Sequence, residues 1–341
     1  MLPLIDFADL PWKFIISVGI FFAIRTYFRG TRYNSKENLD GKIIVITGAD
    51  SGIGFEVTKD LLSRGAVIIM ACHNIKNGEM AIEKLKEAKC SVQNLIIKQI
   101  ELASFHSVRA FANDINKEYE KIDVLINNAG IMMHPNKFTE DDFEIHFAVN
   151  YLAHFLLSLL LLKPLIKSNN GRIINMTSVS HRIARLNLNC IEKKKDSIIK
   201  TDDQSNSVIL EPRDYFAMSK LAIMLSTRIL AKKLEGHNVS VNTCNPGICF
   251  TNIMRYMPFY TNSMLYIFSF PFLWFFMKTA NDGAQTVIYC AIEKTIKDIT
   301  GKYFRECDIA EPGLNVKDDD SSNNLWLRSL EMCKITNIPI L

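Results

Sequence analysis

The chain has 341 residues, of which 48% are hydrophobic and 22% charged, and its formal net charge is +4. This length and hydrophobic content suit one large α/β domain or two smaller ones, and they exclude a disordered chain. The basic residues are scattered apart from the run 193–195, which is typical of a solvated loop, so no nucleic-acid partner is predicted.

The amino terminus predicts a membrane anchor. Residues 10–28 are apolar at all but four positions, with acidic residues before the run and basic residues after it. The uninterrupted core 14–24 is shorter than the roughly 20 residues of a spanning helix, but Lys13 and Arg25 could extend the span by snorkelling. The charge bias favours a single-pass protein, with residues 1–36 as anchor and basic flank and the remainder in the cytosol. A helix lying on the membrane surface is the alternative.

From Lys42 onward the sequence alternates between strand and helix signals. Short apolar runs suited to strands buried on both faces occur at 43–47, 66–71, 95–99, 122–126, 172–176 and 239–244. Helical patterns fall between them, notably at 52–62, 103–119, 142–166 and 216–234. This alternation predicts an α/β fold with a doubly wound parallel sheet. A polar stretch at 189–213 is expected to be an exposed insertion.

The turn after the first predicted strand is rich in glycine. It reads Thr-Gly-Ala-Asp-Ser-Gly-Ile-Gly over 47–54 and opens a predicted helix. Glycine lets the backbone approach a pyrophosphate, and the free N–H groups of a helix start attract an anion. Because the turn stands between a strand and a helix, it is a strong signal for a dinucleotide site.

Five further motifs follow in order. They are Asn-Asn-Ala-Gly at 127–130, Val-Asn at 149–150, Asn-Met-Thr-Ser at 175–178, Ser-Lys at 219–220, and Asn-Pro-Gly at 245–247 with Thr251. Together with the glycine turn, this order and spacing resemble the short-chain dehydrogenase/reductase family, and more closely its retinol-dehydrogenase-like branch, over about residues 40–333. The resemblance implies a single Rossmann-type domain over 37–341 with about seven parallel strands.

The resemblance also implies roles for particular residues. Cofactor binding would involve Gly48, Ser51, Gly52, Ile53, Gly54, His73, Asn127, Ala129, Gly130, Lys220, Pro246, Gly247 and Thr251. In the reaction of this family a hydride passes between a nicotinamide and a carbonyl carbon, and a tyrosine hydroxyl moves the proton on oxygen. Ser178 would hold the substrate oxygen, Lys220 would lower the tyrosine pKa, and Asn150 would support a water relay.

The tyrosine itself is displaced. Phe216 stands four residues before Lys220, where the family has tyrosine, and Tyr215 stands five residues before it. Side chains four apart share a helix face, whereas those five apart are turned by about 140°. Either a reshaped helix start brings Tyr215 to the substrate as the catalytic tyrosine, or the site binds cofactor without ordinary turnover. We expect an active enzyme, with a nucleotide-binding pseudoenzyme in a regulatory or binding role as the alternative.

The second predicted strand bears on cofactor choice. It ends Ala-Cys-His-Asn at 71–74, with no carboxylate for a ribose 2′-hydroxyl and no arginine for a 2′-phosphate. His73 could partly substitute for that arginine, and Asp50 and Glu101 also depart from the usual residues of the branch. We favour NADP(H) over NAD(H).

Two further features bear on substrate and compartment. Residues 257–277 are aromatic and uncharged, which predicts a hydrophobic lid over a lipophilic substrate such as a retinoid, a steroid or another lipid, with a buried core helix as the alternative. The eight cysteines show no C-x-x-C pair and no metal-ligand spacing, which indicates a reducing compartment and no metal site. The sequence thus predicts a membrane-anchored, cytosol-facing oxidoreductase, with the endoplasmic reticulum favoured and a homodimer left open.

Overall fold

The computed structural model describes residues 10–193 and 210–338. Its centre is an eight-stranded sheet with the order β3-β2-β1-β4-β5-β6-β7-β8. The strands are β1 (Ile43–Thr47), β2 (Val67–Cys72), β3 (Leu95–Gln99), β4 (Val124–Asn127), β5 (Gly171–Met176), β6 (Val239–Asn245), β7 (Tyr303–Arg305) and β8 (Asp308–Ile309). Neighbouring strands are parallel except for β7 and β8, which are antiparallel. The predicted parallel sheet is confirmed, with one short antiparallel edge strand added.

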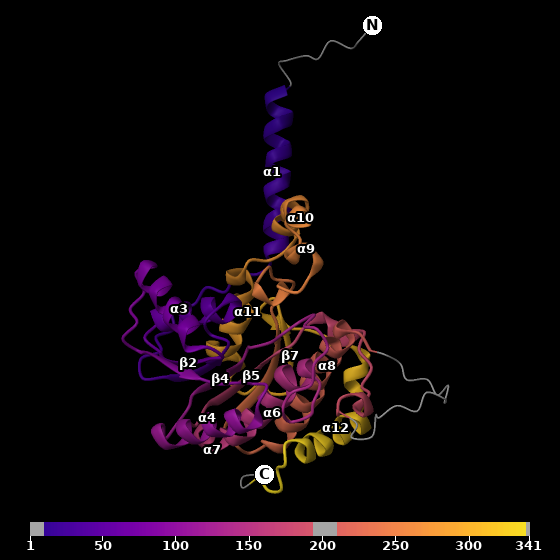
Figure 1. Cartoon of the computed structure of the whole chain (residues 1–341). Coiled ribbons are helices and arrows are strands. Elements are labelled where there is room, and N and C mark those ends of the chain that lie inside the picture. The colour runs from indigo at the N-terminus through magenta and orange to yellow at the C-terminus, as the bar shows by residue number, and fades with distance from the viewer. Residues whose placement is uncertain (1–9, 194–209, 339–341) are drawn as a thin grey trace, which may run out of the picture.

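Helices cover both faces of the sheet (Figure 1). They are α2 (Gly52–Ser63), α3 (Ile75–Glu87), α4 (Phe105–Glu118), α5 (Ile145–Phe147), the π-helix η1 (Ala148–Leu152), α6 (Ala153–Leu160), α7 (Leu162–Lys167), α8 (Pro212–Lys233), α11 (Ala280–Ile292) and α12 (Asp319–Met332). Side chains alternate between the faces of each strand, so Ile44 and Ile46 join one buried core while Val45 joins the other. Burial on both faces explains why the central strands are apolar throughout.

Two predicted helices have different bounds in the structure. The run 142–166 is divided into α5, η1, α6 and α7, and Pro164 in the first turn of α7 lacks the N–H that would continue the preceding helix. The run 216–234 begins earlier, at Pro212, where Glu211 and Asp214 form a capping box. Of the predicted insertion 189–213, residues 194–209 lie outside the described part of the chain.

A single helix, α1 (Leu10–Arg29), projects from the domain (Figure 1). It forms where the sequence predicts an anchor. In residues 10–193 and 210–338, however, no helix is both long and apolar enough to cross a membrane. The prediction of a spanning helix is corrected accordingly, since Lys13 and Arg25 stand within the apolar run.

The base of α1 is tied to the domain. Arg29 Nη2 lies 3.1 Å from the carboxylate of Asp282, which is buried in the first turn of α11. The N–H of Thr31 donates to Glu306 at 2.8 Å. Because Asp282 and Glu306 both belong to the domain, these contacts set the direction in which α1 leaves it.

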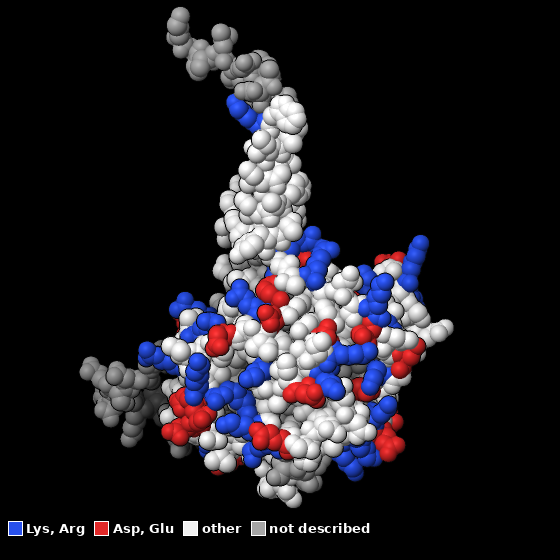
Figure 2. All heavy atoms as spheres, turned by 180° about the vertical axis from the view of Figure 1, so that it is seen from behind, with Lys and Arg blue, Asp and Glu red and all other residues white. Residues whose placement is uncertain are grey.

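The predicted lid forms α9 (Pro258–Thr261) and α10 (Ser263–Phe276), which lie at the base of α1 (Figure 1). The ring of Phe275 is 4.6 Å from that of Phe21, and Arg25 Cζ lies 5.3 Å from the centre of the Trp274 ring. No residue of α10 is buried, so the alternative of a core helix is wrong. Figure 2 shows the result as a mostly uncharged column, with a basic side chain near its far end, rising from a surface of mixed charge.

Candidate functional site

The carboxyl ends of the central strands surround a cavity of about 730 Å³. Of the residues expected to bind cofactor, those that line it are Gly48, Ser51, Gly52, Ile53, His73, Ala129, Gly130 and Thr251. They come from four segments that are far apart in the sequence. The others, Gly54, Asn127, Lys220, Pro246 and Gly247, lie behind or beside the walls and are not part of the lining.

The turn after β1 has the backbone that its glycines allow. Gly48 has φ 61° and Gly52 has φ 55°, values in the left-handed region that favours glycine. A Cβ on Gly54 would collide with the carbonyl oxygen of Gly48. Ser51 caps α2 without a side-chain hydrogen bond, so the first N–H groups of that helix remain available to an anion. The turn and cavity therefore fit the phosphates of a dinucleotide.

The two asparagines after β4 have different surroundings. Asn127 is buried and its Nδ2 donates to Ser158 (2.9 Å) and Asn175 (2.7 Å), away from the cavity. Asn128 lines the cavity, and its Nδ2 donates to the carbonyls of Thr47 (2.8 Å) and Gly48 (3.2 Å). The residue that holds the glycine turn in place is therefore Asn128, which the motif contains but sequence reasoning did not select.

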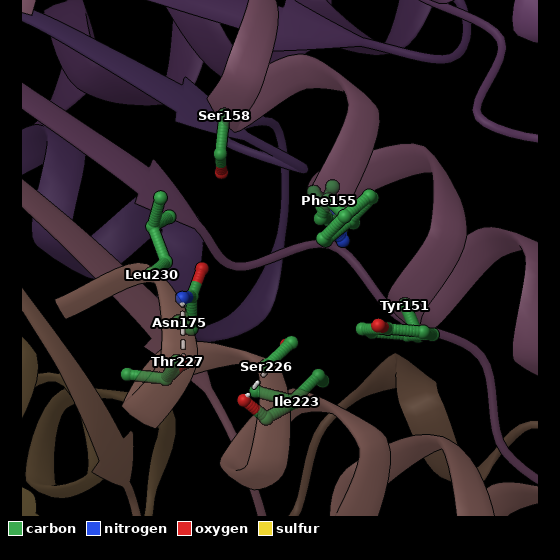
Figure 3. Close-up of a pocket in the computed structure, with 9 residues that line it drawn as sticks. Tyr151, Phe155, Ser158, Asn175, Ile223, Ser226, Thr227 and Leu230 are labelled. Atoms are coloured by element: carbon green, nitrogen blue, oxygen red, sulfur yellow. Dashed lines mark hydrogen bonds between the residues drawn. The ribbon is translucent and has the colours of Figure 1, made fainter. Parts of the chain in front are cut away.

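A second cavity, of about 20 Å³, lies inside the domain beside β5 (Figure 3). Its lining consists of Tyr151, His154, Phe155, Ser158, Asn175, Ile223, Ser226, Thr227 and Leu230. This volume has room for about one water molecule. Because it is closed in by α6 and α8 and holds none of the residues with expected catalytic roles, we interpret it as structural.

Asn150 and Lys220 meet beside Gly130. A Cβ on Gly130 would lie 3.3 Å from Asn150 Oδ1 and 3.8 Å from Lys220 Nζ. Asn150 is held by both backbone groups of Ile131, since its Oδ1 accepts from the N–H at 2.8 Å and its Nδ2 donates to the carbonyl at 3.0 Å. Lys220 Nζ donates to the carbonyl of Met176 at 3.0 Å. Both side chains are buried against the wall that Gly130 contributes to the cavity.

Ser178 follows β5 directly and begins the short helix η2 (Val179–Arg182). Its hydroxyl lies 3.2 Å from that of Ser180 and accepts the N–H of the same residue at 3.3 Å. His181 fixes this turn, because its Nδ1 donates to the Ser178 carbonyl at 2.7 Å and its Nε2 accepts the N–H of Gly313 at 3.0 Å. The structure thus places the predicted oxygen-binding serine at the end of the strand beside Lys220.

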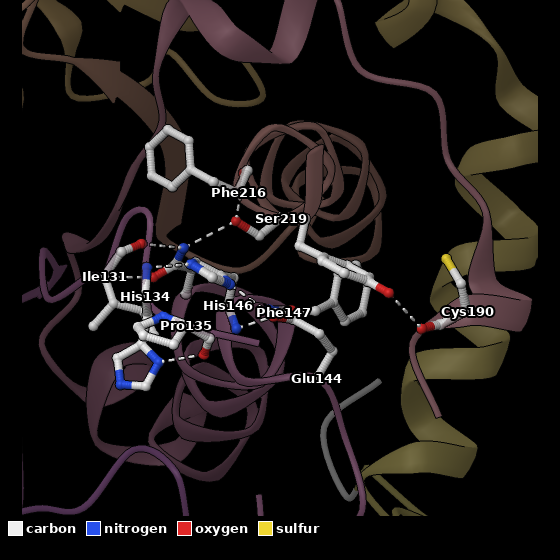
Figure 4. A network of polar contacts seen from close by, with 11 residues as sticks. Ile131, His134, Pro135, Glu144, His146, Phe147, Cys190, Phe216 and Ser219 are labelled. Atoms are coloured by element: carbon white, nitrogen blue, oxygen red, sulfur yellow. Dashed lines mark hydrogen bonds and ion pairs between the residues drawn. The ribbon is translucent and has the colours of Figure 1, made fainter. Parts of the chain in front are cut away.

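The structure separates Tyr215 from Lys220. Helix α8 is unbroken through this region, and the Tyr215 hydroxyl donates to the carbonyl of Cys190 at 3.4 Å. Phe216 lies on the opposite side of α8 from Cys190 (Figure 4), and Lys220 Nζ is 5.6 Å from the centre of its ring. No reshaped helix start brings Tyr215 to the site, so the aromatic ring beside the lysine is one without a hydroxyl.

Two buried histidines hold neighbouring segments of the site in place, and the sequence analysis did not select either of them. His154 lies 3.1 Å from the carbonyl of Asn150 through Nδ1 and 2.9 Å from the Thr47 hydroxyl through Nε2, and burial lowers its pKa to about 4. His146 Nδ1 lies 2.7 Å from the Glu144 carboxylate, and its Nε2 accepts the N–H of His134 at 3.1 Å (Figure 4). The only signal for His154 was its position four residues after Asn150, on the same helix face.

The end of β2 carries an ion pair. His73 Nδ1 lies 2.6 Å from Glu101, although the side chains are 76% and 38% exposed. Asn77 and Lys84 line the same region of the cavity. Lys84 is a cation that the sequence analysis did not select. It lies in the last turn of α3, far along the chain from the end of β2.

Comparisons with known proteins agree with this geometry. A family model described as short chain dehydrogenase matches residues 42–190. Retinol dehydrogenase 12 from Mus musculus is 34% identical over 313 residues, which cover 92% of this chain and 93% of that protein. The chain belongs to the short-chain dehydrogenase family. Retinol dehydrogenase 14 from Mus musculus is 36% identical over 299 residues, covering 84% of each protein.

Solved structures share the fold. An uncharacterized protein from Mycobacterium paratuberculosis has a TM-score of 0.68 and 26% identity, covering 91% of this chain and 100% of that one. A gluconate 5-dehydrogenase from Burkholderia cenocepacia, in complex with NADP and tartrate, has a TM-score of 0.58 and 19% identity, covering 78% and 94%. The second likeness concerns the fold alone.

The placement of the two aromatic residues on α8 predicts opposite effects of substitution. Phe216→Tyr puts a hydroxyl on the face shared with Lys220 and should raise carbonyl reduction by about 10²-fold or more, the usual scale of general-acid catalysis. Among the described residues, the Tyr215 hydroxyl bonds the carbonyl of Cys190, on the side of α8 away from Phe216, so Tyr215→Phe should change turnover less than about threefold. Both rates are measured as NADPH consumption with a lipid aldehyde.

Ser178→Ala is the control for these variants. It should lower any genuine turnover by removing the hydrogen bond to the substrate oxygen. A large loss of rate in Tyr215→Phe with no gain in Phe216→Tyr would contradict the geometry of α8.

Proposed function

We propose that this protein is an NADP(H)-dependent oxidoreductase that interconverts an alcohol and a carbonyl on a lipophilic substrate. The observation that carries the proposal is that Asn150 and Lys220 meet behind Gly130, which lines a cavity whose glycine turn fits a dinucleotide. Lys220 also bonds the carbonyl of Met176, two residues before Ser178. A family dehydrogenase needs these groups whatever its substrate. The similarity to retinol dehydrogenases supports a lipid alcohol or aldehyde.

The proposal assigns one set of residues to the cofactor and another to the substrate. Gly48, Ser51 and Gly52 would hold the phosphates, and Thr251 would lie toward the nicotinamide, which supplies a hydride when bound. Ser178 would hold the substrate oxygen through its hydroxyl. Asn150 keeps the loop at Ile131 in place, so that Gly130 leaves room for ribose beside Lys220.

The end of β2 supports NADP(H) over NAD(H). No carboxylate follows β2 directly to bind a ribose 2′-hydroxyl, while His73 offers a ring nitrogen and Lys84 a positive charge in the lining of the cavity. Glu101 opposes this because its carboxylate lies 2.6 Å from His73. The imidazole is therefore shared between a carboxylate and an incoming phosphate, which should make discrimination weak.

His73→Arg should strengthen that discrimination. A guanidinium can bind Glu101 and still offer a second N–H pair to a 2′-phosphate, so NADPH should bind roughly tenfold more tightly while NADH changes little. Dissociation constants measured by cofactor fluorescence test this, and Lys76→Arg on the exposed side of α3 serves as the matched control. Equal tightening of NADH and NADPH would show that residue 73 does not face the phosphate.

The projecting column supports attachment to a lipid surface. Large apolar side chains are exposed along both helices, including Phe14, Ile16 and Phe22 on α1 and Phe268 and Phe272 on α10. An exposed apolar surface of this extent is typical of a contact with a membrane. We propose that α1 and α10 enter the cytosolic leaflet of a membrane together and that the substrate reaches the domain from the bilayer, which is where a lipophilic carbonyl dissolves.

Loss of apolar contact should release the protein from lipid. Phe268 and Phe272 are 72% and 68% exposed, so the double change to serine should leave the fold intact and weaken binding to phosphatidylcholine vesicles at least tenfold. The matched control changes Leu314 and Leu327, 84% and 61% exposed but remote from α10, to serine. Vesicle flotation measures both, and equal flotation of the two double variants would contradict the proposed contact.

A cofactor-binding pseudoenzyme is the second candidate function, and Phe216 beside Lys220 is the observation that favours it. Hydride transfer from NADPH to a panel of long-chain, polyene and steroid carbonyls separates the two. The oxidoreductase consumes NADPH with at least one of them. Tight NADPH binding without consumption would establish the pseudoenzyme.

A further inference from the structure

The missing tyrosine raises the question of which group gives a proton to the substrate oxygen. Serine hydroxyls and asparagine amides are too weakly acidic, so Ser178, Ser180 and Asn150 can orient the oxygen but not protonate it. A donor has to be titratable, buried at the site and free to point into it. The titratable side chains buried around the site include His146, His154, His181 and Lys220, together with Glu144, whose carboxylate lies 2.7 Å from His146 Nδ1.

None of these histidines has a free ring nitrogen. His146 uses Nδ1 for the carboxylate of Glu144 (2.7 Å) and Nε2 for the N–H of His134 (3.1 Å). His154 uses Nδ1 for a backbone carbonyl (3.1 Å) and Nε2 for the Thr47 hydroxyl (2.9 Å). His181 uses Nδ1 for the carbonyl of Ser178 (2.7 Å) and Nε2 for the N–H of Gly313 (3.0 Å). Burial also lowers the pKa of the His154 and His181 rings, which keeps them neutral. They position neighbouring groups and are not acids.

Lys220 is different. It is 5% exposed, and in the described part of the chain its Nζ has one hydrogen-bond acceptor, the carbonyl of Met176, and no carboxylate partner. An ammonium group carries three N–H donors, so two remain for a ligand. Nζ is 5.6 Å from the centre of the Phe216 ring and would lie 3.8 Å from a Cβ on Gly130, the residue that separates it from the cavity that Gly130 lines. Burial lowers the Lys220 pKa to about 8.

The titratable groups on the surrounding elements do not shift the pKa of Lys220. On α6 the nearest is His154, whose neutral ring adds no charge. On η1, Tyr151 turns its hydroxyl to Ser329 at 2.7 Å, and on β5, Arg172 lies at the opposite end and donates to the carbonyl of Cys290 at 2.9 Å. The ionisation of Lys220 is therefore governed by its burial.

We propose that Lys220 is the general acid and base of this protein, in direct contact with the substrate oxygen. The inference rests on the proposed oxidoreductase function. In reduction, the carbonyl carbon accepts a hydride, its oxygen takes the electron pair of the C=O π bond, and an N–H of the Lys220 ammonium gives that oxygen its proton. The alcohol leaves, and the neutral amine regains a proton from water. In oxidation, the neutral amine takes the proton from the alcohol.

This role gives the two directions opposite pH dependences. Reduction needs the ammonium form, so its rate should fall as the pH rises through about 8. Oxidation needs the amine, so its rate should rise over the same interval. Phe216 contributes an apolar ring whose centre lies 5.6 Å from Nζ and which helps to cover the cation.

The test uses the purified full-length protein and its variants Lys220→Arg, Lys220→Gln and Phe216→Tyr/Lys220→Arg. Single-turnover reduction of a lipid aldehyde by NADPH is followed from pH 6 to 10, and NADPH affinity is measured by fluorescence for each variant. In the cofactor-free protein, the ionisation of the Lys220 amine is measured by competitive acetylation and mass spectrometry, with exposed Lys89 as the reference amine in the same digest. Thermal unfolding confirms that each variant is folded.

We expect the wild-type rate of reduction to follow the ammonium fraction measured by acetylation. Lys220→Arg should keep NADPH affinity within tenfold, because the charge and N–H donors remain, yet lose at least 10²-fold in rate, because a guanidinium does not release its proton. The double variant should recover rate through the new tyrosine. A wild-type rate independent of pH, or a Lys220→Arg rate within threefold of wild type, would overturn the inference while leaving the oxidoreductase standing. NADPH binding without turnover at any pH would overturn both.

Discussion

The four-residue spacing between Phe216 and Lys220 on α8 fixes which side chains this site can use. The capping box at Glu211 and Asp214 starts the helix, and the helix is continuous from Pro212 onward, so residue 215 points away from residue 220. Tyr215 is held in that direction by Cys190. Asn150 lies beside Lys220 at Gly130, and the proposed reaction therefore depends on a lysine next to an apolar ring.

Much of this arrangement could be predicted from the sequence, and the reasons are physical. The central strands are buried on both faces, so they had to be apolar throughout, and the glycine turn needed left-handed backbone at Gly48 and Gly52. Contacts between distant segments could not be predicted in the same way. His154 joins Thr47 to Asn150, and Glu101 joins His73, through side chains that carry no local pattern.

The helices outside the sheet were harder to predict for a different reason. Hydrophobicity identified both 10–28 and 257–277 correctly as apolar segments, but it does not say what such a segment contacts. The structure shows that they lie against each other through Phe21, Trp274 and Phe275, and the ion pair of Arg29 with the buried carboxylate of Asp282 orients α1 on the domain. The lining of the large cavity in the described residues ends at Tyr256, next to α9, so the proposed lipid contact and the site are adjacent in the chain.

The most direct measurement is a crystal structure of the full-length protein with NADPH bound. The account predicts that Lys220 Nζ and the ring of Phe216 face the nicotinamide end of the cofactor, with Ser178 across from them, while Tyr215 keeps its contact with Cys190. A structure in which the first turns of α8 are rewound, so that the Tyr215 hydroxyl stands within hydrogen-bonding distance of Lys220 and the nicotinamide, would contradict it.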